Sequence, residues 1–151
     1  MRIRVSDIVH FFYPMKTTVD KKRLEEGNKV HRIIESSPKF SECLKEKVFE
    51  KRYQYIIVVG KPDIICPSKI IEIKHVKFLN QLIRKRAFIQ IQLYMWLTNI
   101  EKGEILYVFD NEGLEYNSES VSYLGDNYIF SLLDTYLASS LLFLVVKNEK
   151  D

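Results

Sequence analysis

Hydrophobic positions recur along the chain with two different periods, and the changes between them predict the order of elements. Spacings of three and four residues favour helices at 20–36, 78–100 and 126–147. Alternation and short β-branched runs favour strands at 45–55, 56–65, 70–76 and 104–110. The polar stretch 111–125 is predicted to contain a short strand at best. Helices and strands are therefore expected to be mixed in one domain.

The first long helix carries a histidine with an unusual neighbour. Its start is predicted at Asp20, whose side chain can cap it. Gly27 and His31 lie four residues apart on its apolar side, so bare backbone lies beside the imidazole. Such a histidine is commonly a core residue bonded to a carbonyl, but neutral imidazole is also a good ligand for a divalent ion. A shorter helix, capped by Ser6, is predicted to end before Pro14.

A hairpin around a break at Cys66–Lys69 gathers three charged side chains. In its second strand the two-residue period puts Glu72 and Lys74 on one face. Asp63, on the neighbouring strand, can lie beside them. Two carboxylates and a lysine are costly to leave unpaired, and they fit a divalent metal and a phosphate. A surface hairpin with solvated or ion-paired charges is the alternative.

The long central helix has an apolar stripe for packing on the sheet and a separate face with Gln90 and Tyr94. Its N-terminal half contains the densest basic cluster of the chain, which is Arg84, Lys85 and Arg86. Three consecutive cations on a helix cannot all face one phosphate backbone, so a solvated helix face is weighed against a nucleic-acid contact.

Residues 128–146 are strongly apolar, so a membrane helix has to be considered. Serine, threonine and aspartate interrupt this run. The apolar stretch is therefore shorter than the roughly 18 to 20 residues that span a bilayer. A helix packed on the sheet or on a second copy of the chain is the better account, which allows a homo-oligomer and predicts no membrane partner.

Composition limits the classes of partner and compartment. With 151 residues and 46% hydrophobic content, the chain can bury the core of one domain. The net charge is only +3, so contact with DNA would need a local patch. Cys43 and Cys66 are too few and too isolated in the sequence for a disulfide framework or a four-cysteine metal site, and the N-terminus lacks a secretory signal. A reducing, cytoplasmic setting is predicted.

The order of the motifs resembles that of the RecB-like branch of the PD-(D/E)XK nucleases over residues 27–110. The motifs are Gly27 with His31, Gly60 with Asp63, Glu72 with Lys74, and Gln90 with Tyr94. Val5–Ile8 and Tyr13–Lys16 extend the similarity toward the CRISPR-associated RecB-like exonucleases. The resemblance implies an α/β (α+β) class with a restriction-endonuclease-like core, in which helices flank a central mixed sheet in αβββαβ order. Residues 1–151 would form a single nuclease domain with its core at about 20–110.

The resemblance further implies a metal-dependent deoxyribonuclease that hydrolyses phosphodiester bonds, as an exonuclease on DNA ends or single strands. One or two Mg²⁺ or Mn²⁺ ions would be held by the side chains of His31, Asp63 and Glu72 and the carbonyl of Ile73. Lys74 would orient the attacking water, while Gln90 and Tyr94 would position Lys74 or the DNA backbone. The basic cluster at Arg84, Lys85 and Arg86 would contact phosphates.

One feature departs from the family pattern. The similar CRISPR-associated exonucleases hold an iron–sulfur cluster with four cysteines, the first of which precedes the proline. Tyr13 stands at that position and no cysteine follows Cys66, so no such cluster is expected. Packing of Tyr13 and the C-terminal helix would then tie the termini together.

Three other interpretations are weighed. A structure-specific endonuclease of the same fold is disfavoured by the Gly27–His31 and Gln90–Tyr94 signatures. A non-catalytic module that binds DNA ends or a protein partner is disfavoured because all catalytic side chains are present. A membrane-associated protein would be anchored through residues 128–146.

Overall fold

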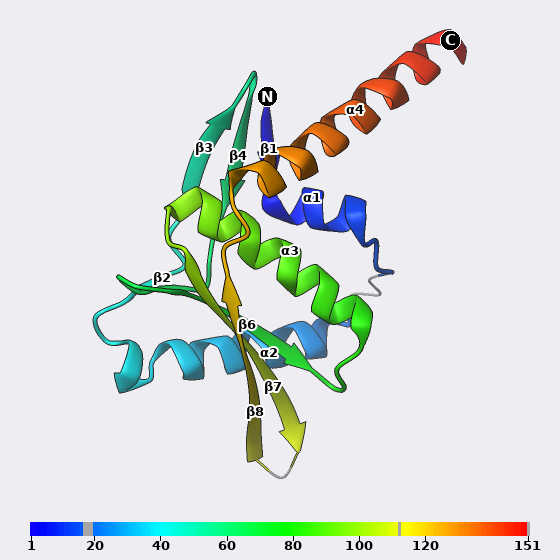
Figure 1. The fold of residues 1–151 in the computed structure, drawn as a ribbon. Helices are drawn as coiled ribbons and strands as arrows, with labels where there is room; N and C mark the ends of the chain where they lie inside the picture. Colours follow the sequence, from blue (N-terminus) through cyan, green and yellow to red (C-terminus); the bar gives the residue numbers. More distant parts are fainter. Residues whose placement is uncertain (17–19, 112, 151) are drawn as a thin grey trace.

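The structure is a computed structural model that describes residues 1–16, 20–111 and 113–150, with side chains described except at 110–114 and 141–150. The helices are α1 (Val5–Phe12), α2 (Lys21–Glu35), α3 (Gln81–Thr98) and α4 (Asp126–Lys150), with a short 3₁₀ helix η1 (Pro38–Phe40). The strands are β1 (Arg2–Arg4), β2 (Leu44–Lys45), β3 (Phe49–Tyr53), β4 (Ile56–Gly60), β5 (Ile64–Ile65), β6 (Ile70–Val76), β7 (Lys102–Asn111) and β8 (Gly113–Ser122) (Figure 1).

The strands form two sheets. The smaller sheet has the order β1-β4-β3, and the larger has the order β2-β5-β6-β7-β8. β6 and β7 run parallel, with α3 as the crossover between them, whereas β5 and β8 run antiparallel to their neighbours. The larger sheet is therefore mixed, and the predicted α/β class is confirmed.

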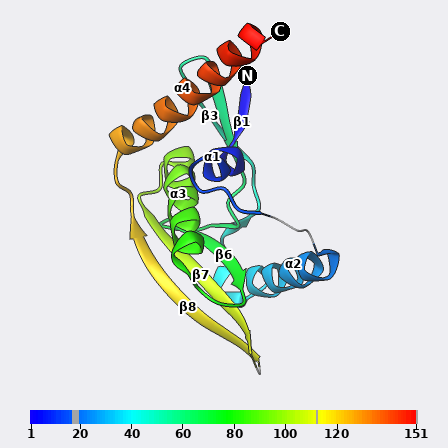
Figure 2. The same ribbon diagram turned by 90° about the vertical axis from the view of Figure 1, so that its right-hand side faces the viewer.

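Helices cover both faces of the larger sheet. α2 lies on one face of β6 and β7, and α3 lies on the other together with α1 (Figure 2). Alternation along β6 divides its side chains accordingly. Ile71 and Ile73 join the core beneath α2, while Ile70 and Val76 join the core beneath α3. Glu72 consequently lies on the α3 side, because it alternates with its two isoleucine neighbours.

Several predicted elements are present where the pattern indicated. Asp20 caps α2 by accepting a hydrogen bond from the backbone N–H of Lys22 at 3.1 Å. The turn between β3 and β4 falls at Gln54 and Tyr55, where the strands predicted at 45–55 and 56–65 meet. α4 begins at Asp126, and its buried residues Ile129 and Leu133 face the core.

The predicted cap of the first helix was wrong. The N-cap is Arg4, and Ser6 lies inside the helix. Asp7 closes the turn because its carboxylate accepts the backbone N–H of Arg4 and also pairs with the Arg4 guanidinium at 3.1 Å. An acid in the first turn thus replaces the hydroxyl cap.

Two strand boundaries also differ from the prediction. The single strand expected through 56–65 is divided at Gly60, so that β4 and β5 belong to different sheets. The stretch 111–125 contains a ten-residue strand, β8, rather than a short one. β8 is polar because it is an edge strand, and its order comes from pairing along β7 and from the buried Gln92, which bonds the backbone of Ser122 and Leu124.

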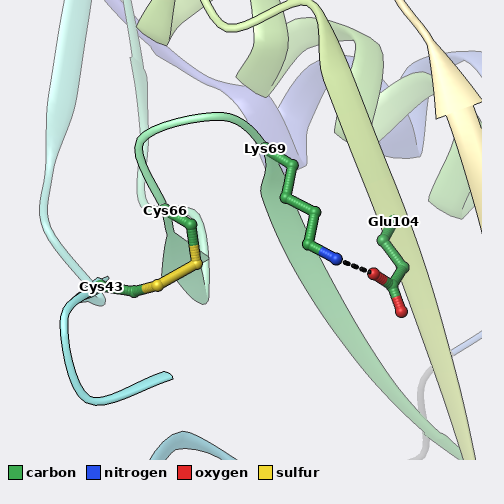
Figure 3. Close-up of a disulfide and its surroundings, with 4 residues drawn as sticks. All are labelled: Cys43, Cys66, Lys69 and Glu104. Atoms are coloured by element: carbon green, nitrogen blue, oxygen red, sulfur yellow. Dashed lines mark hydrogen bonds and ion pairs between the residues drawn. A yellow bond between two sulfur atoms is a disulfide. The ribbon is translucent and has the colours of Figure 1, made fainter. Parts of the chain in front are cut away.

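The inference drawn from the isolation of the two cysteines in the sequence was wrong. Cys43 and Cys66 form a disulfide with Cα atoms 4.4 Å apart (Figure 3). They are 23 positions apart in sequence, but the antiparallel pairing of β2 with β5 brings them together. Beside them, Lys69 pairs with Glu104 at 2.6 Å and ties the start of β6 to β7.

α4 packs on the body through its first half. Ile129, Leu133 and Leu137 are buried in the core beneath α3, and the later part of the helix extends away from the rest of the chain (Figure 1). Among the residues that the structure describes, no helix combines the length and the apolarity that crossing a bilayer requires.

Candidate active site

Three elements bring the predicted charged residues together. The register that pairs Ile64 with Ile71 sets Asp63 level with Glu72 at the point where β5 begins. The Asp63 carboxylate is fixed there, because its Oδ2 accepts the backbone N–H of Ile73 at 2.8 Å. α2 supplies a histidine from one side of the sheet, and α3 covers the other. The geometry thus joins the acids of the two strands, as the motif predicted.

Glu72 is the most costly charge in this cluster. It is only 4% exposed, and among the described side chains its Oε2 is one of the few buried oxygens without a hydrogen-bond partner. Burial raises the pKa of Glu72 well above its usual value, the Asp63 charge raises it further, and Lys74 offsets part of this effect. The Lys74 Nζ lies 3.6 Å from Glu72 Oε1. A buried carboxylate oxygen with a second carboxylate beside it is the environment that a divalent cation stabilises.

His31 is held on both of its nitrogens. Its Nδ1–H donates to the Gly27 carbonyl at 2.9 Å, and its Nε2 lies 3.4 Å from Asp63 Oδ2. Burial alone would lower the pKa of His31, but the bond and charge of Asp63 outweigh it, so the pKa is raised. The same contact lowers the pKa of Asp63 despite the burial of its carboxyl. Gly27 and His31 are therefore neighbours, as predicted. The contact is made by the backbone carbonyl of Gly27, a group that every residue has.

A second chain of contacts holds Lys74. The ammonium donates to Gln90 Oε1, and the Gln90 Nε2 donates to the Tyr94 hydroxyl at 3.0 Å. Burial raises the pKa of Tyr94, so the hydroxyl stays protonated. A Cβ at Gly60 would lie 2.8 Å from the Tyr94 ring and 2.8 Å from Leu97. Only glycine therefore lets β4 approach α3 closely enough for this arrangement.

Two adjoining cavities open onto these residues. The first, which we call the motif cleft, has a volume of about 390 Å³ and is lined by His31, Glu72, Lys74 and the N-terminal half of α2. The second, which we call the cationic groove, measures about 520 Å³. Its charged and polar lining comprises Ser6, Lys16, Arg23, Lys74, His75, Arg86 and Gln90. Arg23, Lys74 and His75 line both, so the two cavities lie next to each other.

Sequence reasoning missed part of this lining. Arg23 could have been found, because it precedes Gly27 and His31 at four-residue intervals on one helix face. Lys16 gave no such signal, because only the packing of the N-terminal segment brings it to Lys74. His75 directly follows the motif lysine, and only the structure shows that it lines both cavities.

The predicted basic cluster is divided between three surroundings. Arg86 lines the cationic groove and donates to the carbonyl of Tyr13. Arg84 is paired with Glu119 of β8. Lys85 lies with its Nζ 5.8 Å from the centre of the Tyr13 ring. Only Arg86 among the three therefore lies beside Lys74, as expected for consecutive positions on a helix.

The ligand chemistry of the cleft fits a divalent cation in part. Asp63 and Glu72 supply carboxylate oxygens, one of them buried and unpaired. Within the described residues, no group of three histidine, cysteine or acidic side chains is arranged to hold an ion. His31 faces Asp63 rather than standing apart as a third ligand. The two carboxylates are thus the part of the predicted ligand set that the geometry favours.

Comparison with solved structures identifies the class of fold. The chain is similar to the crystal structure of SSO0001, with a TM-score of 0.71 and 20% identity over 93% of this chain and 75% of the other. It is also similar to an alkaline exonuclease (LHK-Exo) from Laribacter hongkongensis, with a TM-score of 0.56 and 14% identity over 97% and 89% of the two chains. A phage-related exonuclease from Haemophilus somnus gives 0.52 and 16% over 86% and 74%.

The chain therefore has the nuclease fold of these exonucleases, which confirms the predicted fold class. No family model matches the sequence, and no curated protein is similar to it in sequence. At identities of 14–20% the likeness concerns the fold alone.

Proposed function

We propose that this protein is a metal-dependent deoxyribonuclease of the PD-(D/E)XK type, and that it acts as an exonuclease. The observation that carries the proposal is the convergence of Asp63, Glu72 and Lys74 beneath one cleft, with a buried Glu72 oxygen that lacks a partner. The resemblance to the RecB-like branch supports the same conclusion. The fold is shared with exonucleases, one of which has been crystallised in complex with dAMP.

Different residues of the chain would have different roles in phosphodiester hydrolysis. Asp63 and Glu72, with His31 and the Ile73 carbonyl as further predicted ligands, would hold Mg²⁺ or Mn²⁺. Such an ion, when bound, would supply polarisation of the scissile phosphate and a lowered pKa for a coordinated water. Lys74, held by Gln90, would orient that water and stabilise the charge that develops on the phosphate oxygens.

Two further groups would position the substrate. Tyr94 holds Gln90 and, through it, sets the direction of the Lys74 ammonium. The cationic groove would receive the phosphate backbone, with Arg86 as the member of the predicted basic cluster that lies in it. Arg84 and Lys85 lie outside the groove, so their phosphate contacts would come from a different part of the DNA.

A DNA substrate also bears on the compartment. A cytoplasmic location stays part of the proposal because DNA is an intracellular substrate. The Cys43–Cys66 disulfide removes the support that was drawn from cysteine usage, since disulfides are rare in reducing compartments.

The test is cleavage of end-labelled linear DNA and closed circular DNA in Mn²⁺, Mg²⁺ or EDTA, with the parent and Lys74→Ala. We expect the parent to degrade linear DNA only with metal, and Lys74→Ala to lose at least about 100-fold in rate, since a group that stabilises transition-state charge contributes this much. Equal rates for the two proteins would overturn the assigned role of Lys74. Cleaved circles would indicate an endonuclease, and binding without cleavage in any metal would indicate a DNA-binding module.

A further inference from the structure

A third hollow lies beside the cationic groove and is built differently. It measures about 380 Å³ and is bounded by three aromatic rings from three elements. Tyr13 follows α1, Phe88 belongs to α3, and Tyr128 belongs to the first turn of α4. These elements lie together on the α3 side of the sheet (Figure 2). We call this site the aromatic hollow.

The rings differ in how firmly they belong to the core. Tyr13 and Tyr128 are half-buried and pack against the core beneath α3. Phe88 is also half-buried but belongs to neither described core cluster, and its ring meets Tyr128 edge-on at 6.4 Å. Core packing therefore accounts for the positions of the two tyrosines but not for that of Phe88.

The charges of the hollow are nearly balanced. Arg84 is already paired with Glu119, the acidic residue of the lining. Lys85 remains as the second cation, and its Nζ lies 5.8 Å from the centre of the Tyr13 ring. A ligand would consequently bind this hollow through contact with flat apolar surface more than through charge. An unpaired nucleobase is a ligand of this kind.

The aromatic hollow is joined to the cationic groove through Tyr13. Arg86 lines the groove and donates to the Tyr13 carbonyl, while the Tyr13 ring lines the hollow. Lys85 and Arg86 are consecutive on α3 and so point to the two sides of this boundary. A strand whose phosphates occupy the groove would bring the bases beyond it to the three rings.

We propose that the aromatic hollow is a base-stacking subsite for single-stranded DNA, next to the cationic groove. This inference rests on the proposed nuclease function and narrows its substrate to an unpaired strand. Each stacked base contributes about 1–3 kcal/mol in single-strand binding proteins. That range corresponds to a change in Kd of about 5- to 150-fold. A base in a duplex is stacked on its neighbours and is not available to these rings.

The test measures the Kd of a labelled oligothymidine, of an equally long strand made of abasic sites, and of a duplex, all in EDTA. Phe88→Ala should weaken binding of the oligothymidine by about 5- to 150-fold and leave the abasic strand and the duplex unchanged. Phe88→Trp should bind like the parent, because it keeps an aromatic face. Phe78→Ala is the matched control, since Phe78 is 67% exposed, precedes α3 and is not among the residues that line the hollow.

The outcomes separate the subsite from the nuclease proposal. Unchanged binding of oligothymidine by Phe88→Ala overturns the subsite but not the nuclease. An equal loss for all three ligands also overturns it, because stacking cannot act on an abasic strand. A parent that binds none of the three, and cuts no DNA with metal present, overturns both proposals.

Discussion

The burial of Glu72 lowers the stability of the folded protein for electrostatic reasons. Its carboxylate is buried, one oxygen has no partner, and Asp63 stands beside it. Buried like charges are usually removed by selection for stability alone. Their presence here agrees with a site whose charges are used in binding or catalysis, where stability is commonly sacrificed.

This cost predicts that Glu72→Gln stabilises the protein in EDTA. The folded state raises the pKa of Glu72 above its unfolded value of about 4.3, so the unfolded chain loses this proton first as the pH rises. The parent should therefore lose stability from about pH 4 upward, by about 1.4 kcal/mol for each unit by which the pKa is raised. The variant has no such proton. Its advantage in Tm should grow with pH, which thermal denaturation from pH 4 to 8 would measure.

Asp63→Asn is the matched control, because its effect on stability should have the opposite sign. The folded state lowers the pKa of Asp63, so this carboxylate adds stability above its unfolded pKa and loses that contribution as the pH falls. We expect this variant to be less stable than the parent at pH 7 and to approach it in acid. A Glu72→Gln protein that is less stable than the parent at every pH would contradict the cost assigned to Glu72.

At the scale of elements, the cleft depends on how α2 is fixed to the sheet. His31 and Asp63 meet only if α2 keeps its place over β5 and β6. The core between them is small and contains Val30, Ile34, Phe40 and Cys66 among its buried residues. The Cys43–Cys66 disulfide closes the loop from η1 to β5 at the edge of this core.

We expect Cys43→Ser to lower the free energy of unfolding by about 3 kcal/mol, because a disulfide restricts the unfolded chain by an amount that grows with the logarithm of the loop length. Urea denaturation with and without a thiol reductant measures this. The parent should lose stability on reduction, whereas Cys43→Ser/Cys66→Ser should be insensitive. A parent with the same midpoint in both conditions would show that the two thiols are not joined.

At the scale of the whole molecule, charge is concentrated rather than abundant. The net charge is only +3, yet the described lining of the cationic groove contains Lys16, Arg23, Lys74 and Arg86 and no acid. Such a local field attracts a phosphate backbone even when the total charge is small. The predicted homo-oligomer, with α4 as its surface, stays a prediction at this scale.

The groove predicts a particular dependence of DNA affinity on salt. Arg23→Gln should weaken binding to all sequences alike and reduce the slope of log K against log salt by about 1, because one phosphate contact is lost. Titrations of one oligonucleotide at several salt concentrations would measure the slope. Arg32→Gln is the matched control, since it is exposed on the same helix and lies half a turn around from Arg23. Equal slopes for both variants would exclude the groove as the DNA path.

The sequence by itself determined the elements whose signals are local. Helical spacing and a capping aspartate located α2, and the two-residue period of β6 put Glu72 and Lys74 on one face. The order of these motifs was enough to indicate a nuclease fold. Such features depend on residues a few positions apart, and their periods are properties of the backbone alone.

Only the tertiary structure decided the contacts between distant segments. Edge pairing with β7 ordered the polar strand β8, and the pairing of β2 with β5 joined Cys43 to Cys66. Packing of α3 against the N-terminal segment and β8 divided the basic cluster between the groove, Glu119 and the Tyr13 ring. Each of these contacts joins positions that no backbone period relates. Their closeness arises from burying the shared core, which sums weak contributions from the whole chain.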